Sequence, residues 1–306
     1  MPHPEKAIVT GAFSYTGGYI ARHLLRQDVR VTTLTRHPDT RDSFGGAVKC
    51  APLDFSDVDA LSRSMKGASV FYNTYWIRFE RGETSFDAAV ENSEILFNAA
   101  KNAGIRKIVH ISVSNPSLKS RLPYFKGKWQ VEEALKNIGI PYAIIRPTLI
   151  FGPDDLLLNN IAWALRRFPV FPMYGNGDYP VQPIYAEDVA EQAVAAATVS
   201  ENFVADAAGP DTFSFEELIG LLASAMGIRA RFIHMPPSVS LALTSIVGLV
   251  VRDIVLTRDE VDGLMTGLLT SKTLPTGTTR FNDWLNENAH NLGRHYESEL
   301  QRNFRL

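Results

Sequence analysis

The sequence predicts an α/β protein in which a doubly wound parallel sheet is followed by a smaller, mixed C-terminal domain. Two observations support this fold class. Apolar runs of strand length alternate with amphipathic helical segments up to about residue 150. The first of these units, residues 6–36, reads as strand, glycine-rich turn, helix and strand, which is one βαβ unit. We therefore expect a Rossmann-type domain over residues 1–150 and a second domain over 151–306, of which about 178–208 return to the first sheet.

Length and composition are those of an ordinary globular protein. The chain has 306 residues, 45% hydrophobic and 21% charged, which is enough for one large or two moderate domains. A net charge of −2 gives no footprint for nucleic acid, and the histidines show no metal-ligand spacing. The single cysteine, Cys50, excludes an intrachain disulfide, and we expect a buried small residue in a reducing compartment. Without a basic and apolar leader after Met1, a cytoplasmic location is predicted.

The turn after the first apolar run resembles the dinucleotide-binding fingerprint. Its three small-residue positions hold Gly11, Ser14 and Gly17. Gly11 permits the sharp exit from the strand, Gly17 lets the helix pack closely on the sheet, and Ser14 replaces the usual middle glycine. The helix start offers backbone N–H groups to a pyrophosphate. A glycine-rich loop of any α/β protein is the alternative, but the flanking strands and helix favour a dinucleotide site.

The residue that ends the second strand indicates which cofactor is preferred. NAD-binding proteins carry an Asp or Glu about 20 residues beyond the fingerprint, where it holds the ribose 2′-hydroxyl. Here that place is taken by Arg36, followed by His37 and Arg41. A guanidinium grips a 2′-phosphate that a carboxylate would repel. Arg36 is alternatively a solvated surface residue, but beside the fingerprint it favours NADP(H) over NAD(H).

Three further segments continue the alternation. A third strand over 48–53 ends at Asp54, which could accept from the adenine amino group, cap a helix over 56–65, or do both. A fourth strand over 69–74 runs into an aromatic cluster around Trp76, which either meets a ligand at the carboxyl edge of the sheet or packs under a loop. A helix over 86–102 and a fifth strand over 105–113 follow, and His110 inside that strand is expected to be a core residue.

The fifth strand and the next helix bring together residue types used in proton transfer. The strand delivers Ser112 and Ser114 to the carboxyl edge of the sheet. In the following helix Tyr124 and Lys128 are four residues apart and therefore share a face. This pair is common by chance, but its position after a serine-bearing strand and a dinucleotide turn makes it specific.

With these residues in place, the chain resembles the extended or atypical short-chain dehydrogenase/reductases of the NAD(P)-dependent epimerase/dehydratase group. The resemblance rests on the glycine turn and on the serine, tyrosine and lysine residues. Two later stretches add to it. Residues 144–153 are similar to the family's sixth strand and nicotinamide loop, and residues 183–190 are similar to a helix start of the family. It extends from Lys6 to Ala197. Within the group, the chain is most similar to the branch of the nucleotide-binding accessory subunit of respiratory complex I.

The resemblance implies roles for individual residues. Tyr124 is the general acid or base, Lys128 holds the nicotinamide ribose and lowers the pKa of the tyrosine, and Ser114, or alternatively Ser112, hydrogen-bonds the substrate oxygen. Ser114 precedes Tyr124 by only ten residues, a short connection for an extended member. The expected cofactor-binding residues are Thr10, Gly11, Phe13, Ser14, Tyr15, Thr16, Gly17, Arg36, His37, Asp54, Thr74, Lys128 and Pro147.

Beyond Pro153 the regular alternation stops. Helices are expected over 156–168, 187–199 and 213–226, the last with Thr212 or Ser214 as its cap, and a strand over 203–207. The apolar segment 239–251 is too short to cross a bilayer and reads as a buried or interface helix, with a membrane-surface contact as the minor alternative. We expect this region to form a lid over a substrate cleft. Its candidate lining residues, each with a packing alternative, are Trp76, Phe151, Tyr174 and Gln182.

Two functions of different class follow from these observations. The first is an NADP(H)-dependent oxidoreductase, a carbonyl or alcohol reductase or an epimerase, acting on a small-molecule substrate through a Ser-Tyr-Lys site. The second is a catalytically silent NAD(P)-binding protein, a redox sensor or an assembly subunit. The intact Tyr124 and Lys128 favour the enzyme, whereas the fold alone decides nothing. A homodimer is a further expectation.

Overall fold

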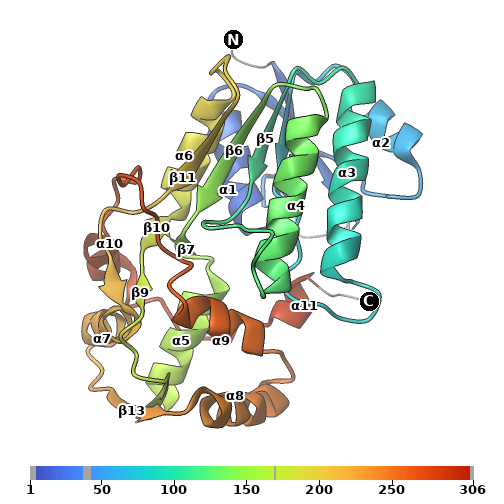
Figure 1. The fold of residues 1–306 in the computed structure, drawn as a ribbon. Helices are drawn as coiled ribbons and strands as arrows, with labels where there is room; N and C mark the ends of the chain where they lie inside the picture. Colours follow the sequence, from blue (N-terminus) through green and yellow to red (C-terminus); the bar gives the residue numbers. More distant parts are fainter. Residues whose placement is uncertain (1–4, 37–42, 169, 304–306) are drawn as a thin grey trace. The chain divides into compact units, whose positions relative to one another are not determined.

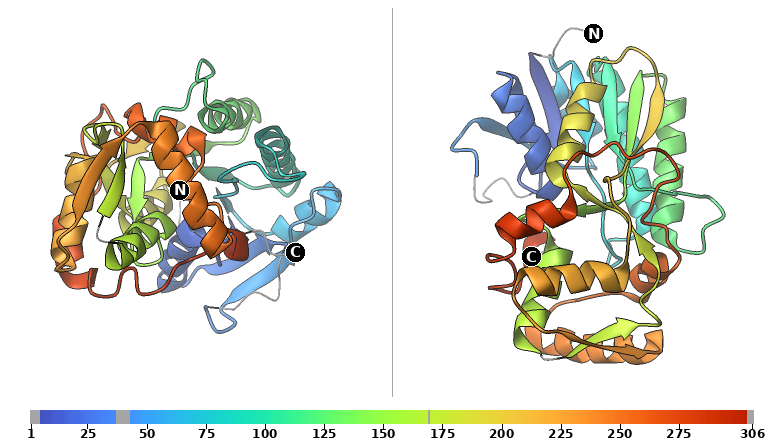
Figure 2. Two further views of the ribbon diagram at one scale, coloured as in Figure 1. Left: turned by 90° about the horizontal axis from the view of Figure 1, so that it is seen from below. Right: turned by 90° about the vertical axis from the view of Figure 1, so that its left-hand side faces the viewer.

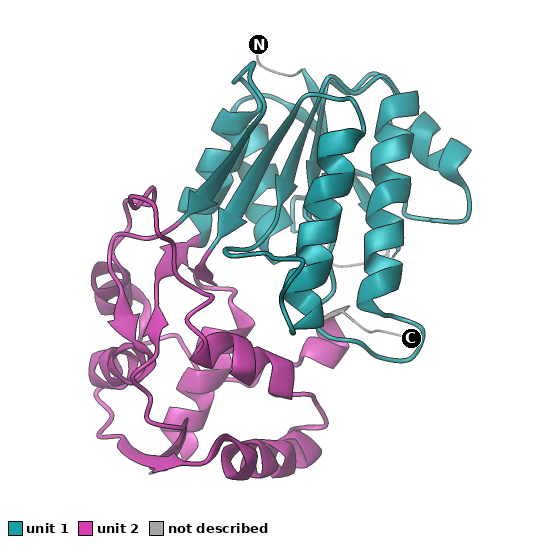
Figure 3. Cartoon of the chain, in the orientation of Figure 1, with its two compact units in different colours: residues 1–147, 186–207 teal, residues 148–185, 208–306 magenta. Residues whose placement is uncertain are grey.

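The computed structural model describes residues 5–36, 43–168 and 170–303. The chain divides into two compact units: residues 1–147 with 186–207, and residues 148–185 with 208–306 (Figure 3). The segment that returns to the first unit thus begins at Ala186 and ends at Ala207.

The first unit is built on a seven-stranded sheet with the order β11-β6-β5-β4-β1-β2-β3. Every pairing between neighbouring strands is parallel. This confirms the predicted Rossmann-type doubly wound sheet, in which the strand order reverses between β1 and β4. The strands are β1 Lys6–Thr10, β2 Arg30–Thr35, β3 Val48–Pro52, β4 Val70–Asn73, β5 Lys107–Ile111, β6 Tyr142–Pro147 and β11 Phe203–Ala207.

Helices cover both faces of this sheet (Figures 1 and 2). One layer contains α2, α3 and α4, which pack side by side, and the other contains α1 and α6. The central strands β4 and β5 are buried along their whole length, as expected for parallel strands covered on both faces. The helices of the first unit are α1 Tyr15–Arg26, α2 Val58–Met65, α3 Phe86–Asn102, α4 Pro123–Asn137 and α6 Ala186–Ala196.

The second unit is irregular, with short strands paired in twos around an apolar core. The predicted cap at Ser214 is confirmed, since its hydroxyl accepts from Glu217 N while the Glu217 carboxylate accepts from Ser214 N. Its helices are α5 Leu156–Arg167, α7 Phe215–Ala225, α8 Pro237–Val251, α9 Arg258–Met265, α10 Phe281–Asn288 and α11 Glu299–Asn303. Its strands are β7 Leu149–Phe151, β8 Val170–Tyr174, β9 Pro180–Val181, β10 Pro183–Tyr185, β12 Phe213–Ser214 and β13 Arg231–Met235.

One expectation about burial is wrong, and a second is wrong in one of its alternatives. Cys50 is exposed, because β3 is the edge strand of the sheet and most of its residues face solvent. The segment expected as a buried or interface helix forms α8, in which only Ser240 and Gly248 are buried. Burial is therefore not what makes α8 apolar, and the interface and membrane-surface alternatives stay predictions. Its exposed large side chains are Val239, Leu243, Ile246, Leu249 and Val250.

Candidate functional site

The glycine turn between β1 and α1 is closed by its own backbone. Gly11 has a φ of +65°, a conformation that glycine adopts without strain. Its carbonyl oxygen accepts from Ser14 N at 2.8 Å and from Ser14 Oγ at 2.6 Å. The hydroxyl of Ser14 is therefore directed into the turn, which explains how a serine fits where the fingerprint usually has glycine.

The start of α1 packs against this turn without room for a side chain. A Cβ at Gly17 would overlap the carbonyl oxygens of Gly11 and Thr10. The first turn of α1 carries no acidic residue, and Ser14 makes no side-chain capping hydrogen bond. A helix N-terminus with these properties attracts an anionic group. The turn thus fits the pyrophosphate of a dinucleotide.

Residues beside the turn join neighbouring strands. Thr74 N donates to Thr10 Oγ1 at 2.8 Å, and Thr74 Oγ1 donates to the Thr10 carbonyl at 2.6 Å, so the carboxyl ends of β1 and β4 are held together. Thr16 is half-buried in the first turn of α1. Phe13 and Tyr15 pack in ring pairs, Phe13 with Phe44 at 6.0 Å and Tyr15 with Tyr19 at 5.7 Å between centroids.

Arg36 follows β2 with its side chain exposed, at the position where a 2′-phosphate is expected. His37 and Arg41 lie outside the described residues. The Asp54 carboxylate accepts from both Ser56 N at 2.9 Å and Ser56 Oγ at 2.7 Å, and these bonds lower its pKa. The alternative of Asp54 as a helix cap is wrong: α2 begins at Val58, and Asp57 caps it by accepting from Ala60 N.

The helix α4 carries Tyr124, Lys128 and Glu132 at intervals of four residues, so the three share a face. Lys128 is only 3% exposed, and its Nζ donates to the Ile111 carbonyl, at the carboxyl end of β5, at 3.0 Å. The same Nζ lies 4.8 Å from the centre of the Trp76 ring. Burial lowers the pKa of Lys128 to about 7, against the opposing charge of Glu132.

Tyr124 is half-buried and lies among aromatic rings. Its ring meets Trp76 at 6.0 Å, Phe86 at 5.9 Å and Phe125 at 5.4 Å, in each case edge to face. Such packing fixes the plane of the phenol ring.

The two serines of the β5 end have different environments. Ser112 Oγ donates to Glu132 Oε1 at 2.6 Å, and Glu132 also binds Arg146 of β6 through two hydrogen bonds of 2.9 Å and 2.5 Å. Glu132 is completely buried, so this network ties α4 to β5 and β6. Ser114 is also completely buried, and its backbone N–H donates to the Pro147 carbonyl at 2.8 Å.

His110 is a core residue, as predicted. It is completely buried, its ring packs against Phe97, and Asn73 Nδ2 lies 3.2 Å from its Nδ1. Burial and the nearby Lys128 hold its pKa well below the usual value, so His110 is uncharged at neutral pH.

The four candidate substrate residues are packed within their own units. Trp76 stacks on Phe86 in the first unit, with ring centres 6.0 Å apart. In the second unit, Tyr174 Oη lies 2.7 Å from Thr244 Oγ1. Gln182 donates to the Gly209 carbonyl and accepts from Ser271 N. Their contact with a substrate stays a prediction.

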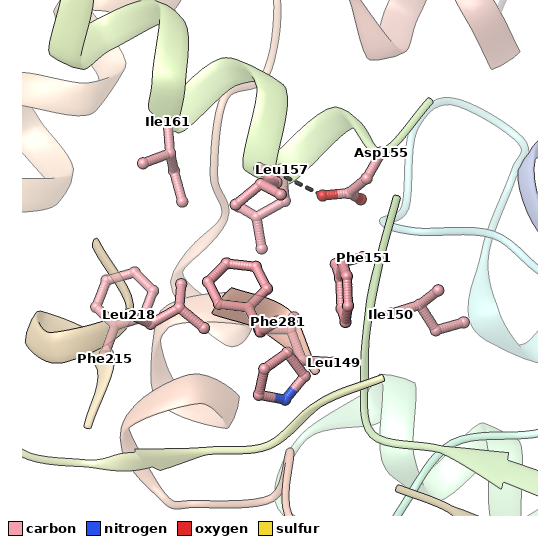
Figure 4. A pocket seen from close by; sticks show the side chains of 11 residues that line it. Leu149, Ile150, Phe151, Asp155, Leu157, Ile161, Phe215, Leu218 and Phe281 are labelled. Atoms are coloured by element: carbon pink, nitrogen blue, oxygen red, sulfur yellow. Dashed lines mark hydrogen bonds between the residues drawn. The ribbon is translucent and has the colours of Figure 1, made fainter. Parts of the chain in front are cut away.

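Phe151 lines a small hollow of the second unit (Figure 4). The hollow is almost entirely apolar, and its one carboxylate, Asp155, accepts from Leu158 N at the start of α5. The lining residues are Leu149, Ile150, Phe151, Asp155, Leu157, Leu158, Ile161, Pro183, Phe215, Leu218 and Phe281.

Two residues of the α4 site, Glu132 and Gly127, are not among those predicted from the sequence. Glu132 continues the four-residue spacing of Tyr124 and Lys128, and that spacing was the available signal. Gly127 gives room to Trp76, since a Cβ there would lie 2.9 Å from Trp76 Cη2. No local pattern marks this contact, because the two residues come from different segments.

The described residues hold neither a metal-binding cluster nor a membrane-spanning helix. No group of three or more histidine, cysteine, aspartate or glutamate residues there could hold a metal ion. Within the same ranges, no helix combines the length and the apolar character needed to cross a membrane.

Comparisons with known proteins agree with this geometry. The sequence model of an NAD(P)H-binding family matches residues 11–155. Subunit 9 of the NADH dehydrogenase [ubiquinone] 1 alpha subcomplex, a mitochondrial protein of Arabidopsis thaliana, is 25% identical over 252 residues, which cover 78% of this chain and 62% of that protein. The mouse subunit is 29% identical over 194 residues, covering 60% and 51%. This confirms the predicted resemblance to the extended short-chain dehydrogenase/reductases.

The chain thus spans about half to two thirds of the length of these subunits. A ceramide reductase of Caulobacter vibrioides is 27% identical over 237 residues, with 74% of this chain and 73% of that protein covered. Among solved structures, an NADPH-dependent quinone oxidoreductase of Escherichia coli in complex with NADPH has a TM-score of 0.73 at 21% identity, covering 93% of this chain and 98% of that one. That likeness concerns the fold.

Proposed function

We propose that the protein is an NADP(H)-dependent oxidoreductase that reduces a carbonyl group, or oxidises the corresponding alcohol, with Tyr124 as its proton donor or acceptor. The observation that carries the proposal is the position of Tyr124 and Lys128 on one face of α4, next to the carboxyl end of β5. The glycine turn after β1 lies at the same edge of the sheet. Parallel sheets of this kind bind their ligands at that edge.

The residues around the turn would hold the cofactor. The α1 N-terminus suits the pyrophosphate, and Gly11 and Gly17 allow the tight turn that places it there. Arg36 suits a 2′-phosphate and supports NADP(H) over NAD(H). When bound, NADPH supplies the hydride that a carbonyl carbon accepts.

The α4 residues would handle the proton. Tyr124 Oη gives its proton to the carbonyl oxygen as negative charge develops there, and Lys128, as an ammonium, stabilises the phenolate that remains. Ser114 is the serine that would donate to the same oxygen. Ser112 is less suited to this role because its hydroxyl already donates to the buried Glu132.

A test of this proposal compares the parent with Tyr124→Phe in steady-state oxidation of NADPH. The panel contains ketones, aldehydes and sugar nucleotides. We expect at least one compound whose reduction disappears in the variant while the variant still binds NADPH. The same low rate in both proteins, across the panel, would contradict catalysis by Tyr124.

A second candidate is a catalytically silent NAD(P)-binding protein that acts as a redox sensor or assembly subunit. The similarity to complex I subunits favours it. Under this alternative, NADPH binds, no compound of the panel is reduced, and the protein co-purifies with partner subunits. The small-molecule substrate belongs to the first candidate and is tested with it, while the homodimer and the cytoplasmic location stay predictions.

A further inference from the structure

The indole of Trp76 is held against the surface of α4. Position 127 of that helix is a glycine, and a Cβ there would lie 2.9 Å from Trp76 Cη2 and 3.2 Å from Cζ2. The indole ring also stacks on Phe86 and packs edge to face with Tyr124. Gly127, Phe86 and Tyr124 thus define a single place for the indole.

In that place the indole covers the ammonium of Lys128. The Nζ atom lies 4.8 Å from the ring centre, within the range of a cation–π interaction. An ammonium has three N–H groups in a fixed tetrahedral arrangement. One of them donates to the Ile111 carbonyl at 3.0 Å, and the face of Trp76 lies against another side of the group. These two contacts fix the rotation of the ammonium and leave one N–H direction for a further acceptor.

We propose that Trp76 is a positioning residue for Lys128: its indole excludes water from the ammonium and, with the Ile111 carbonyl, directs the remaining N–H toward the cofactor ribose. The role in cofactor binding rests on the proposed function given above. The covering of Lys128 by Trp76 does not, because it is a property of the protein by itself.

The charge state of Lys128 reports on this cover. Water exclusion is the main reason that its pKa is low, with Glu132 of α4 acting in the opposite direction. The other titratable groups that face this region are His110 of β5, which is uncharged at neutral pH, and Tyr124, one helical turn away. Removal of the indole admits water and therefore moves the pKa of Lys128 back toward that of a free lysine.

The test is an NMR titration of cofactor-free protein carrying ¹³C-labelled lysine, in which the Lys128 Cε signal is assigned by its loss in Lys128→Arg. In the parent we expect a midpoint near pH 7. In Trp76→Ala we expect an upward shift of about one pH unit or more, and in Trp76→Phe, which keeps an aromatic face, a much smaller shift. Trp163→Phe, a tryptophan of α5 in the second unit, is the matched control and leaves the midpoint unchanged.

Gly127→Ala gives an independent variant should Trp76→Ala unfold. It alters no aromatic group and favours the helix, but its new methyl group displaces the indole. A shift in the same direction as Trp76→Ala supports the proposal. An unchanged Lys128 midpoint in a folded Trp76→Ala or Gly127→Ala would overturn it, as would equal shifts in Trp76→Ala and Trp76→Phe.

NADPH affinity is measured on the same variants and separates this inference from the proposed function. We expect Trp76→Ala to bind NADPH about tenfold more weakly than Trp76→Phe, as for the loss of one directed hydrogen bond to a charged group. Shifted midpoints with no NADPH binding by the parent would overturn the proposed function while leaving the covering of Lys128 by Trp76 intact. Shifted midpoints with equal NADPH affinities would overturn the part of the proposal that directs an N–H toward the ribose.

Discussion

The glycine turn before α1 and the polar face of α4 are built in opposite ways. The turn is shaped by the backbone. Gly11 and Gly17 lack side chains, and the Gly11 carbonyl accepts hydrogen bonds from both Ser14 N and Ser14 Oγ. The face of α4 is shaped by buried side chains, with Lys128 under Trp76 and Glu132 between Ser112 and Arg146. A site formed by backbone atoms requires only that no side chain blocks the turn. A site formed by buried polar side chains requires a partner for every charge.

The comparison predicts its largest effect at Glu132. Glu132→Ala removes both hydrogen bonds to the Arg146 guanidinium and the largest of the negative charges that act on it. The loss of one partner of a buried pair costs about 3–5 kcal/mol of unfolding free energy. Urea denaturation measures the loss. Glu133→Ala is the control, because Glu133 pairs with Lys136 on a partly exposed side of α4 and contributes about 0–1 kcal/mol. Equal losses in the two variants would contradict the account.

A second substitution disrupts the backbone site. Gly17→Ala places a methyl group against the Gly11 and Thr10 carbonyls and should cost about 3 kcal/mol, as for other overpacked positions, together with NADPH binding. The neighbouring Gly18→Ala is the milder comparison, since its methyl group would lie 3.3 Å from the Ala12 carbonyl oxygen, a close contact that a small shift relieves. Thermal unfolding distinguishes the two, and a Gly17→Ala variant as stable as Gly18→Ala would show that the turn has room to spare.

The cofactor preference sharpens the role of the turn. Under the proposed function, Arg36→Ala would remove a charge-assisted pair with the 2′-phosphate, and we expect a ten- to hundredfold loss of NADPH affinity, equivalent to about 1.5–3 kcal/mol, with NADH affinity unchanged. Calorimetric titration with both cofactors measures the difference. Arg30→Ala, at the opposite end of β2, serves as the control. Equal affinities of the parent for NADPH and NADH would refute the assignment.

The smallest predicted effect is on how steeply the unfolding free energy changes with pH. The pKa of Lys128 is about 7 in the folded protein and about 10.5 in the unfolded chain. Between pH 7 and 10.5, Lys128 is therefore protonated in the unfolded chain and largely neutral in the folded protein. The unfolding free energy therefore rises with pH in this window, by at most about 1.4 kcal/mol per pH unit from Lys128. Lys128→Met removes this contribution between pH 7 and 9, and Lys126→Met, an exposed position, does not. Parallel stability curves for the parent and Lys128→Met would show that Lys128 is hydrated.

The two regions also differ in how far the sequence could predict them. The turn was predicted residue by residue, because a fingerprint between a strand and a helix is a local pattern. The bounds of α3 were likewise predicted, since a long amphipathic segment ends before Gly104. The structure adds that Ser85 caps its start.

The environment of α4 depends on contacts between distant segments. Trp76 follows β4 and Gly127 lies in α4, so only the folded chain brings them together. Cys50 was placed in the core because its strand is apolar in part, and only the strand order shows that β3 is an edge. The start of α2 was missed because Asp54 and Asp57 are both capable caps.

The separate roles of the glycine turn and of α4 are tested most directly by single-turnover hydride transfer. The complex of Tyr124→Phe with NADPH is mixed rapidly with a reducible carbonyl compound, and NADPH absorbance is followed beside the parent. We expect NADPH affinity within about twofold of the parent and a hydride-transfer rate lower by about a hundredfold or more, because the turn holds the cofactor while α4 supplies the proton. A parental rate in Tyr124→Phe would contradict this account, because hydride transfer would then proceed without the Tyr124 hydroxyl.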